Sequence, residues 1–231
     1  MDLKSNLPSH IGFIMDGNGR WAREKGLVRT KGHQEGLDTA KNIIKYASDI
    51  GIKFVSLYAF STENWKRAQE EVSFLMFLIK KHLKQEYNFY RENQIRVVHS
   101  GDLKGLPEDV QKEIILVVND TKDFKGLTVN LLINYGGRDE ITRAVNKIIS
   151  KNLTNITESD IQKNLDNPMI PDVDLMIRSS GEERLSNFLL WQCAYSEFYY
   201  SNVLWPDFSV DDFNKALEAY NKRTRRFGGI K

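Results

Sequence analysis

Three segments of the sequence combine charged side chains with amide or hydroxyl side chains. The first is Asp16-Gly17-Asn18-Gly19-Arg20-Trp21, which follows an apolar run. Glycines let backbone amides approach an anion closely, and the guanidinium group of Arg20 suits phosphate oxygens. Asp16 would repel a diphosphate unless a hard cation such as Mg2+ bridges the two. The segment predicts a diphosphate site with a metal-binding carboxylate, although a tight turn capped by Asp16 explains the glycines equally well.

Two basic residues follow the first segment. Arg29 and His33 lie where they would extend the same anion site. Taken alone, each is more often an ordinary surface or helix-capping residue.

The second segment is Ser61-Thr62-Glu63-Asn64-Trp65-Lys66-Arg67, directly after the apolar run that ends at Phe60. Helix capping accounts for the small polar residues. It leaves Trp65 and Arg67 unexplained. A large ring beside a cation suits a ligand with an apolar chain and a charged head.

The third segment extends from Asp174 to Trp191. An apolar run delivers Arg178, and Arg184 and Ser186 come after a glycine, where we expect a helix to start. Two guanidinium groups and a hydroxyl are able to bind one diphosphate without a metal. The alternative is a surface network in which an arginine pairs with Glu182 or Glu183.

One further carboxylate stands out. Glu197 lies in an aromatic segment, Cys193-Ala194-Tyr195-Ser196-Glu197-Phe198-Tyr199-Tyr200. Because a buried unpaired charge is costly, we expect Glu197 to have an ionic partner or a metal-binding role.

The elements that must position these residues alternate along the chain. Apolar or β-branched runs predict strands at 10–15, 54–60, 95–100, 127–133 and 175–178. Helical spacing appears in Leu37, Ala40, Ile44 and Ala47, in Val72, Leu75, Met76 and Ile79, and, after Pro107, in Val110, Ile114 and Val117. We therefore expect a single α/β domain over residues 1–231, with a mostly parallel central sheet flanked by helices. In such sheets ligands bind beyond the carboxyl ends of the strands, where the polar segments fall.

Composition limits the classes of function. The 231 residues carry a net charge of +2, which gives no broad field for nucleic acid or a membrane surface. Cys193 is the single cysteine, the first six residues lack the apolar stretch of a secretory signal, and no apolar run approaches the length of a transmembrane helix. We expect a cytoplasmic protein without a transmembrane segment, with peripheral placement at the inner face of the membrane left open.

Taken together, the segments resemble the cis-prenyltransferase family, and most closely the bacterial undecaprenyl diphosphate synthases. The resemblance covers nearly the full chain. It rests on residues 10–22, Gly32-His33, residues 58–65, Asn134-Tyr135-Gly136-Gly137-Arg138, residues 174–191, Leu204-Trp205-Pro206-Asp207-Phe208 and Arg225-Arg226-Phe227-Gly228-Gly229.

The resemblance implies roles for these residues. Asp16 would hold Mg2+ and assist ionisation, and Asn64, with Ser61, would lie near the proton removed during condensation. Glu197 would share in metal binding with the neighbouring subunit. The allylic diphosphate would be bound by Gly17, Asn18, Gly19, Arg20, Trp21, Arg29 and His33. Isopentenyl diphosphate would be bound by Ser61, Arg67, Arg178, Arg184 and Ser186.

The resemblance also implies a homodimer with a hydrophobic substrate tunnel. Arg226 and Gly228 of the tail would act in the partner's active site. Candidates for the tunnel wall, which a plain hydrophobic core explains as well, are Leu75, Met76, Leu78, Ile79, Leu127, Val129 and Leu131.

The implied activity is Mg2+-dependent addition of isopentenyl diphosphate to an allylic diphosphate, with undecaprenyl diphosphate as the expected, membrane-associated product. Two alternatives remain: a noncatalytic partner subunit of the same fold, and a diphosphate-binding α/β protein of another kind. Close relatives often have histidine where this chain has Glu183 and proline where it has Ala68. Glu183 weakens the expected positive potential at the isopentenyl site, and Ala68 would loosen the loop over the substrate.

Overall fold

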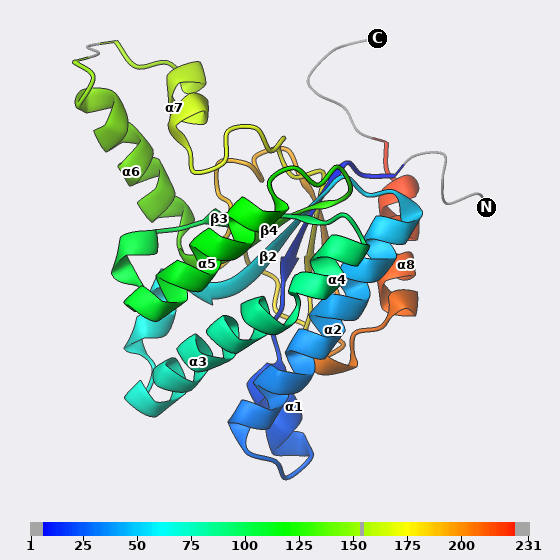
Figure 1. The fold of residues 1–231 in the computed structure, drawn as a ribbon. Coiled ribbons are helices and arrows are strands. Elements are labelled where there is room, and N and C mark those ends of the chain that lie inside the picture. Colours follow the sequence, from blue (N-terminus) through cyan, green and yellow to red (C-terminus); the bar gives the residue numbers. More distant parts are fainter. Residues whose placement is uncertain (1–6, 153–154, 225–231) are drawn as a thin grey trace.

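The computed structural model describes residues 7–152 and 155–224. Within these residues the chain forms one α/β unit in which helices surround a central sheet (Figure 1). This confirms the predicted fold class.

The sheet of the described chain has six strands in the order β3-β4-β2-β1-β5-β6, and all neighbouring strands are parallel. The strands are β1 (His10–Ile14), β2 (Phe54–Ser61), β3 (Arg96–Ser100), β4 (Thr128–Tyr135), β5 (Leu175–Arg178) and β6 (Glu197–Tyr200). The first five confirm the predicted strands. The edge strand β6 was not predicted, because all its residues are half-buried and show no inside-outside alternation.

The helices include the three predicted from apolar spacing, which are α2, α3 and α5. The α-helices are α1 (Asn18–Glu24), α2 (Arg29–Ile50), α3 (Gln69–Gln85), α4 (Tyr87–Glu92), α5 (Glu108–Thr121), α6 (Gly137–Ile149), α7 (Glu158–Asn164) and α8 (Val210–Asn221). Short 3-10 helices are η2 (Thr62–Lys66), η3 (Leu103–Gly105) and η4 (Trp205–Asp207).

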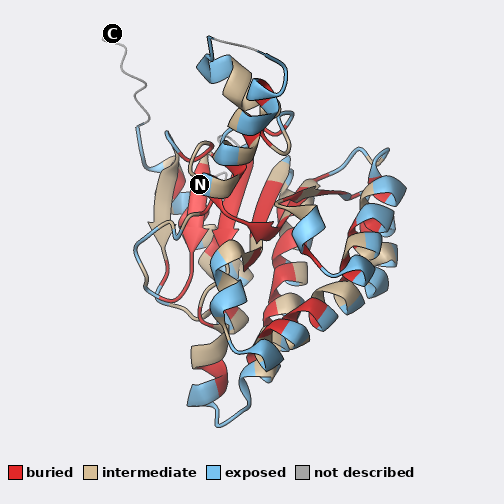
Figure 2. Ribbon diagram, turned by 90° about the vertical axis from the view of Figure 1, so that its left-hand side faces the viewer, coloured by how far each residue is buried: buried red, intermediate tan, exposed pale blue. Residues whose placement is uncertain are grey.

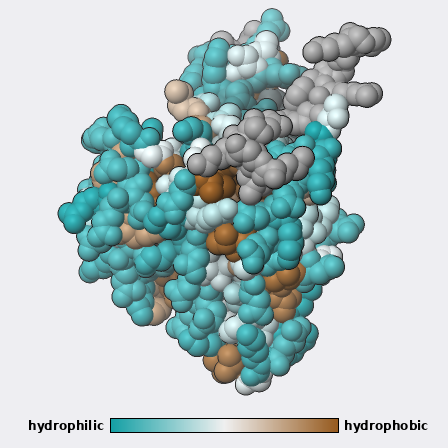
Figure 3. Space-filling model, turned by 90° about the vertical axis from the view of Figure 1, so that its right-hand side faces the viewer, coloured by the Kyte–Doolittle hydropathy of each residue, from teal (hydrophilic) through white to brown (hydrophobic). Residues whose placement is uncertain are grey.

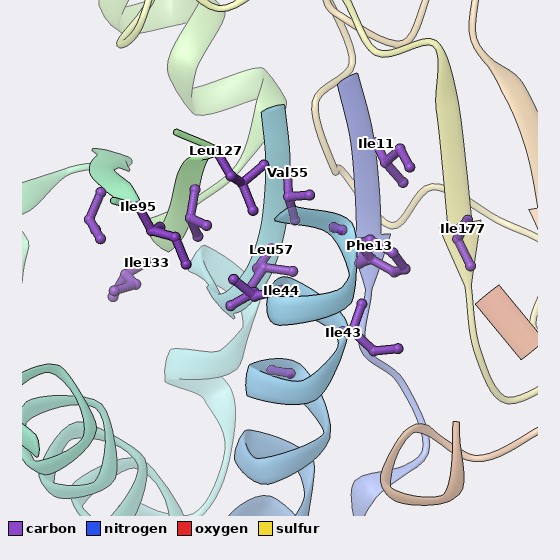
Figure 4. Close-up of a cluster of buried hydrophobic side chains, with 14 of the residues drawn as sticks. Ile11, Phe13, Ile43, Ile44, Val55, Leu57, Ile95, Leu127, Ile133 and Ile177 are labelled. Carbon is purple, nitrogen blue, oxygen red and sulfur yellow. The ribbon is translucent and has the colours of Figure 1, made fainter. Parts of the chain in front are cut away.

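The main core lies between the sheet and the helices α2, α3, α5 and α8. Figure 4 shows Ile43 and Ile44 of α2 close to Phe13 and Leu57 of the sheet, and each of these side chains is at most 3% exposed. Burial of one such side chain contributes about 1.5–3 kcal/mol to stability. The strands and the inner helix faces hold most of the buried residues (Figure 2).

A smaller core covers the opposite face of β1 and β5. There Ile14 and Met176 pack against Phe188 and Leu189. Gly12 faces the same side, where a Cβ atom would lie 2.7 Å from the ring of Phe188. The third polar segment is therefore anchored to the sheet by apolar side chains.

The surface on the right-hand side of Figure 1 is mostly hydrophilic, with apolar side chains in small separate groups (Figure 3). In the described ranges, no helix combines the length and the apolar character that crossing a membrane would require.

Candidate active site

The loop after β1 is held open by a glycine. Gly17 has a φ of 108°, which favours glycine, and a Cβ atom there would lie 3.1 Å from the backbone of Leu204. The N–H group of Trp205 donates to the backbone oxygen of Asp16 at 3.0 Å. The chain near η4 thus fixes the loop from one side.

The Asp16 side chain is about one-third exposed. The N–H of Gly17 donates to its Oδ1 at 2.7 Å, and Nη2 of Arg178 donates to its Oδ2 at 2.8 Å. Burial raises the pKa of Asp16, but the hydrogen bond and charge of Arg178, helped by Gly17 and Arg20, outweigh burial and hold the pKa below its ordinary value. Asp16 is therefore a carboxylate at neutral pH.

Arg178 is the last residue of β5 and pairs in register with Ile14 of β1, so the sheet itself brings it beside the Asp16 loop. The residue is only 3% exposed. Its Nη1 donates to the backbone oxygen of Arg184 and, at 2.8 Å, to Oγ of Ser186. This predicted pair, Arg178 and Ser186, is in direct contact.

Glu182 lies between two other arginines. Arg20 donates to the backbone and hydroxyl oxygens of Ser180 and forms an ion pair with Glu182 at 3.4 Å. Arg184 pairs with the other carboxylate oxygen of Glu182. The Arg184 side chain is 60% exposed, so this is the surface pairing named above as the alternative, and it adds little stability.

The second segment forms η2. The N–H of Ser61 donates to Oδ1 of Asn64 at 3.1 Å, and the Ser61 side chain accepts from the Asn64 backbone. Helix capping thus does explain these small polar residues. Trp65 donates its indole N–H to Oδ1 of Asn134 at 2.7 Å and packs on Phe60, which ties the segment to β4.

Three predicted phosphate ligands converge on one carboxylate that the sequence did not indicate as functional. Oε1 of Glu71, in the first turn of α3, lies 2.9 Å from Arg67 Nη1, 3.1 Å from Arg29 Nε and 3.5 Å from His33 Nε2. Burial lowers the pKa of His33 below its ordinary value, the charges of Arg67 and Arg29 lower it further, and Glu71 opposes them. The spacing of four residues between Arg67 and Glu71 is the signal that could have found this pair.

A cavity of about 690 Å³ opens at the carboxyl edge of the sheet. Its polar lining includes the predicted residues Asp16, Asn18, His33, Ser61, Asn64, Arg67, Arg178, Arg184 and Ser186. Its apolar lining includes Leu37, Leu75, Leu78 and Ile79. Of the candidate tunnel residues, Met76, Leu127, Val129 and Leu131 do not line this cavity and belong to the main core.

A second hollow of about 550 Å³ lies on the other side of Asp16, which lines both. It is lined by Asp16, Gly17, Gly19, Arg20, Arg23, Gly26, Leu27 and Arg29. The predicted anion ligands thus fall into two neighbouring concave sites that share one carboxylate.

Some predicted residues lie apart from both hollows. Trp21 is buried and donates its indole N–H to Asp207 at 2.7 Å. Glu197 begins β6, in register with Leu175 at the amino end of β5, whereas Asp16 lies beyond the carboxyl end of β1. Its Oε2 accepts from Arg223 Nη1 at 2.7 Å, so the expected ionic partner exists. The tail residues Arg226 and Gly228 lie outside the described residues.

The expected helix start after Gly181 is wrong. Ser186, Asn187 and Leu189 have positive φ angles of 48°, 64° and 35°, and the chain forms successive turns. These turns place the Asn187 amide against Oε1 of Glu63 at 2.9 Å, which links the second and third segments. Sequence reasoning missed this link as well.

The side chains around Asp16 fit a Mg2+ ion only if the substrate supplies some of the metal ligands. Among residues 7–152 and 155–224, no group of three or more His, Cys, Asp or Glu side chains is placed to hold a metal. Mg2+ is commonly bound by one or two carboxylates together with substrate phosphates. A partly exposed carboxylate shared by two arginine-lined hollows fits that mode, with the remaining ligands supplied by substrate and water.

The fold and these two hollows define an α/β protein that is built to bind anions beyond the carboxyl edge of a parallel sheet. A family model described as "Putative undecaprenyl diphosphate synthase" matches residues 14–228. The chain therefore belongs to the undecaprenyl diphosphate synthase family of cis-prenyltransferases, as the sequence motifs indicated.

Individual relatives agree over the full length. An isoprenyl transferase of Treponema denticola is 54% identical, over 95% of this chain and 96% of the relative. An isoprenyl transferase of Fusobacterium nucleatum is 52% identical, over 99% of both chains. The crystal structure of lavandulyl diphosphate synthase from Lavandula x intermedia with dimethylallyl diphosphate has a TM-score of 0.94 at 36% identity, covering 96% of this chain and 99% of that one. A probable undecaprenyl diphosphate synthase from Campylobacter jejuni has a TM-score of 0.83 at 38% identity, covering 97% and 100%.

Proposed function

We propose that the protein is a Mg2+-dependent enzyme that condenses isopentenyl diphosphate with an allylic diphosphate, farnesyl diphosphate in the first round. The product is a long-chain polyprenyl diphosphate, undecaprenyl diphosphate, which serves as the precursor of a lipid carrier for cell-wall synthesis. The observation that carries the proposal is that two concave, arginine-lined sites meet at the single carboxylate of Asp16.

The allylic diphosphate is assigned to the smaller hollow. Its wall includes Gly17, Gly19, Arg20 and Arg29. Asn18 and His33, which we also assign to this diphosphate, line the neighbouring larger cavity, and Trp21 supports the loop through its hydrogen bond to Asp207. The allylic carbon then lies toward Asp16.

Isopentenyl diphosphate is assigned to the polar part of the larger cavity. Arg178 and Ser186 are already joined there by a hydrogen bond, and the exposed Arg184 and the half-buried Arg67 add guanidinium groups. The growing chain lies along the apolar part, whose wall includes Leu75, Leu78 and Ile79. A volume of about 690 Å³ lies in the range of about 300–1,000 Å³ typical of ligand sites.

The chemistry follows from these positions. The allylic carbon-oxygen bond breaks, the isopentenyl double bond attacks the allylic carbon, and loss of a proton leaves a new Z double bond and free diphosphate. Asp16 would hold Mg2+, which would supply positive charge to offset that of the departing diphosphate. Arg20, Arg29 and the loop amides stabilise the same charge, and preorganised donors of this kind usually contribute more to catalysis than any other single effect.

Asp16 would hold the metal beside the leaving group, and Ser61 and Asn64 are assigned to the position of the proton that is lost. Their reciprocal hydrogen bonds hold both side chains at the cavity wall. In this proposal a diphosphate oxygen of the bound substrates accepts the proton that is lost.

The proposal includes a homodimer with shared sites. Within one chain, Glu197 lies at the amino ends of the strands and Asp16 at their carboxyl ends, so a metal role for Glu197 requires the neighbouring subunit. We assign Arg226 and Gly228 the same kind of role in the partner's site. The enzyme acts at the cytoplasmic face of the membrane, where its lipid product is used.

A noncatalytic partner subunit is the second candidate. It would keep the fold but lose ligands, whereas this chain has Asp16, Asn64 and Arg178 around one cavity. The test is incubation of the purified full chain with farnesyl diphosphate, labelled isopentenyl diphosphate and Mg2+, followed by extraction into organic solvent. Label in extracted polyprenyl products supports the enzyme. No incorporation by a folded protein that binds both diphosphates supports the partner subunit.

A further inference from the structure

The smaller hollow contains an arginine without a role in the proposed chemistry. Arg23, in the last turn of α1, lines this hollow together with Arg20 and Arg29. A basic residue at this end of a helix also interacts favourably with the helix dipole, so its presence alone decides nothing. Its ionic surroundings are more informative.

Each of the other charged residues of the hollow has an ionic partner. Arg20 pairs with Glu182 at 3.4 Å, Arg29 pairs with Glu71 at 3.1 Å, and Asp16 pairs with Arg178 at 2.8 Å. Within the part of the chain that the structure describes, Arg23 forms no ion pair and no side-chain hydrogen bond. Arg23 is therefore the arginine of this hollow whose charge has no ionic partner among the described residues.

We propose that Arg23 is a further binding residue for the diphosphate of the allylic substrate. This rests on the proposed function and deepens it. A guanidinium group suits phosphate oxygens geometrically, and its charge also draws the anion toward the loop. The residue is exposed, at the rim of the hollow, so its attraction is screened by water and salt.

The position at the rim determines which kinetic constant Arg23 controls. Asp16, Gly17 and Gly19 line the same hollow but are buried or half-buried, so we assign them to its inner part, beside the bond that breaks. An interaction at the rim is equally strong before and during bond breaking. Uniform binding of this kind lowers the Michaelis constant without changing turnover.

The test uses the full chain and the substitution Arg23→Gln. Calorimetric titration with inorganic pyrophosphate and Mg2+ should show about three- to ten-fold weaker binding, the range expected for one partly exposed charge-assisted contact. The Michaelis constant for farnesyl diphosphate should rise by a similar factor, while that for isopentenyl diphosphate and the turnover number stay within about two-fold. Arg23→Lys should recover most of the affinity, because the charge is retained.

The matched control is Arg91→Gln. Arg91 is likewise exposed and lies in the last turn of a short helix, α4, but it lines neither hollow. The substitution Arg91→Gln removes the same charge and the same helix-end interaction as Arg23→Gln. Because Arg91 lies outside both hollows, this substitution should leave pyrophosphate affinity unchanged.

Unchanged pyrophosphate affinity in Arg23→Gln, an equal loss in Arg91→Gln, or no pyrophosphate binding by the unaltered protein would each overturn the proposal. If the unaltered protein binds pyrophosphate through Arg23 but forms no polyprenyl product, the proposed function fails while the binding role of Arg23 stands.

Discussion

Asp16 and Arg178 are joined by a hydrogen bond of 2.8 Å in a largely buried site, and their opposite charges offset each other. A cation bound to Asp16 must share the carboxylate with this guanidinium group. Arg178 is also held by Ser186 and by the backbone of Arg184, so it would keep its place if Asp16 bound a cation. The pair thus links the proposed metal-binding carboxylate to the proposed isopentenyl site.

The first prediction concerns Asp16→Asn, which keeps the size of the side chain but removes its charge. We expect turnover to fall about 100-fold or more, because metal binding between carboxylate and leaving diphosphate is lost. Steady-state kinetics and the thermal unfolding midpoint measure the two effects separately. Near-normal turnover in a folded variant would reject the role of Asp16.

The second prediction concerns His33, whose pKa lies below its ordinary value because of burial and the nearby Arg67 and Arg29. Glu71 raises this pKa, so Glu71→Gln should lower it further. NMR titration of the histidine rings measures the shift directly, since the chain has only four histidines. His99 lies outside the cluster and should titrate unchanged. An unaltered or raised pKa of His33 would contradict the observed geometry.

For individual residues, the sequence predicted which side chains lie in the site better than it predicted which side chains they contact. Asp16 and Arg178 were predicted because each directly follows or ends an apolar strand, and parallel strands share one carboxyl edge. Glu71 was not, because its contacts with Arg29 and His33 depend on how α3 packs beside α2. That packing is a tertiary property without a local pattern.

At the scale of elements, the contact between α1 and α2 positions the first loop. Gly32 and Gly36 of α2 let the helix approach Asn18 closely: added Cβ atoms would lie 2.0 Å from the Asn18 backbone oxygen and 2.3 Å from its Oδ1. The loop that carries Gly17 and Asn18 therefore depends on two small residues one turn apart.

The third prediction is that Gly32→Ala lowers the free energy of unfolding by about 2 kcal/mol, as overpacking does, although alanine favours helices by about 1 kcal/mol. The clash is with a backbone atom, which cannot rotate away. Denaturant unfolding measures the change. Gln34→Ala, at an exposed position of the same helix, should change stability by less than about 0.5 kcal/mol. Equal effects of both substitutions would refute the close-contact explanation.

Elements with a buried face were predictable, whereas irregular ones were not. The strands β1 to β5 and the helices α2, α3 and α5 carry periodic apolar residues that pack in the cores. The turns after Gly181 lack such a period. Positive φ angles at Ser186 and Asn187 arise where the chain docks on Gly137 and Glu63, which only the fold brings near.

At the scale of the whole molecule, Glu197 lies at the amino ends of the strands and Asp16 beyond their carboxyl ends. At about 3.3 Å per residue, the two are roughly 10 Å or more apart along the strands. The proposed shared site therefore needs a second copy of the chain. Arg223 binds Glu197 and the backbone of Phe198, so the described chain ends anchored on β6.

The fourth prediction is that truncation after Arg223 leaves a folded dimer with strongly reduced condensation, because Arg226 and Gly228 act in the partner's site. Mixing the truncated protein with Asp16→Ala protein should restore activity once subunits exchange. In the heterodimer one site then has both defects and the other has neither. Full activity of the truncated homodimer, or no rescue in demonstrated heterodimers, would overturn the shared-site proposal.

The central claim is that one chain binds two different diphosphates on either side of Asp16. Calorimetric titration of the full chain with Mg2+ tests it most directly, using isopentenyl diphosphate and an unreactive thiolo analogue of farnesyl diphosphate. We predict that each ligand binds once per chain, that either binds in the presence of saturating amounts of the other, and that Arg178→Lys weakens only isopentenyl diphosphate. Mutual exclusion of the two ligands, with one site per chain, would contradict the account.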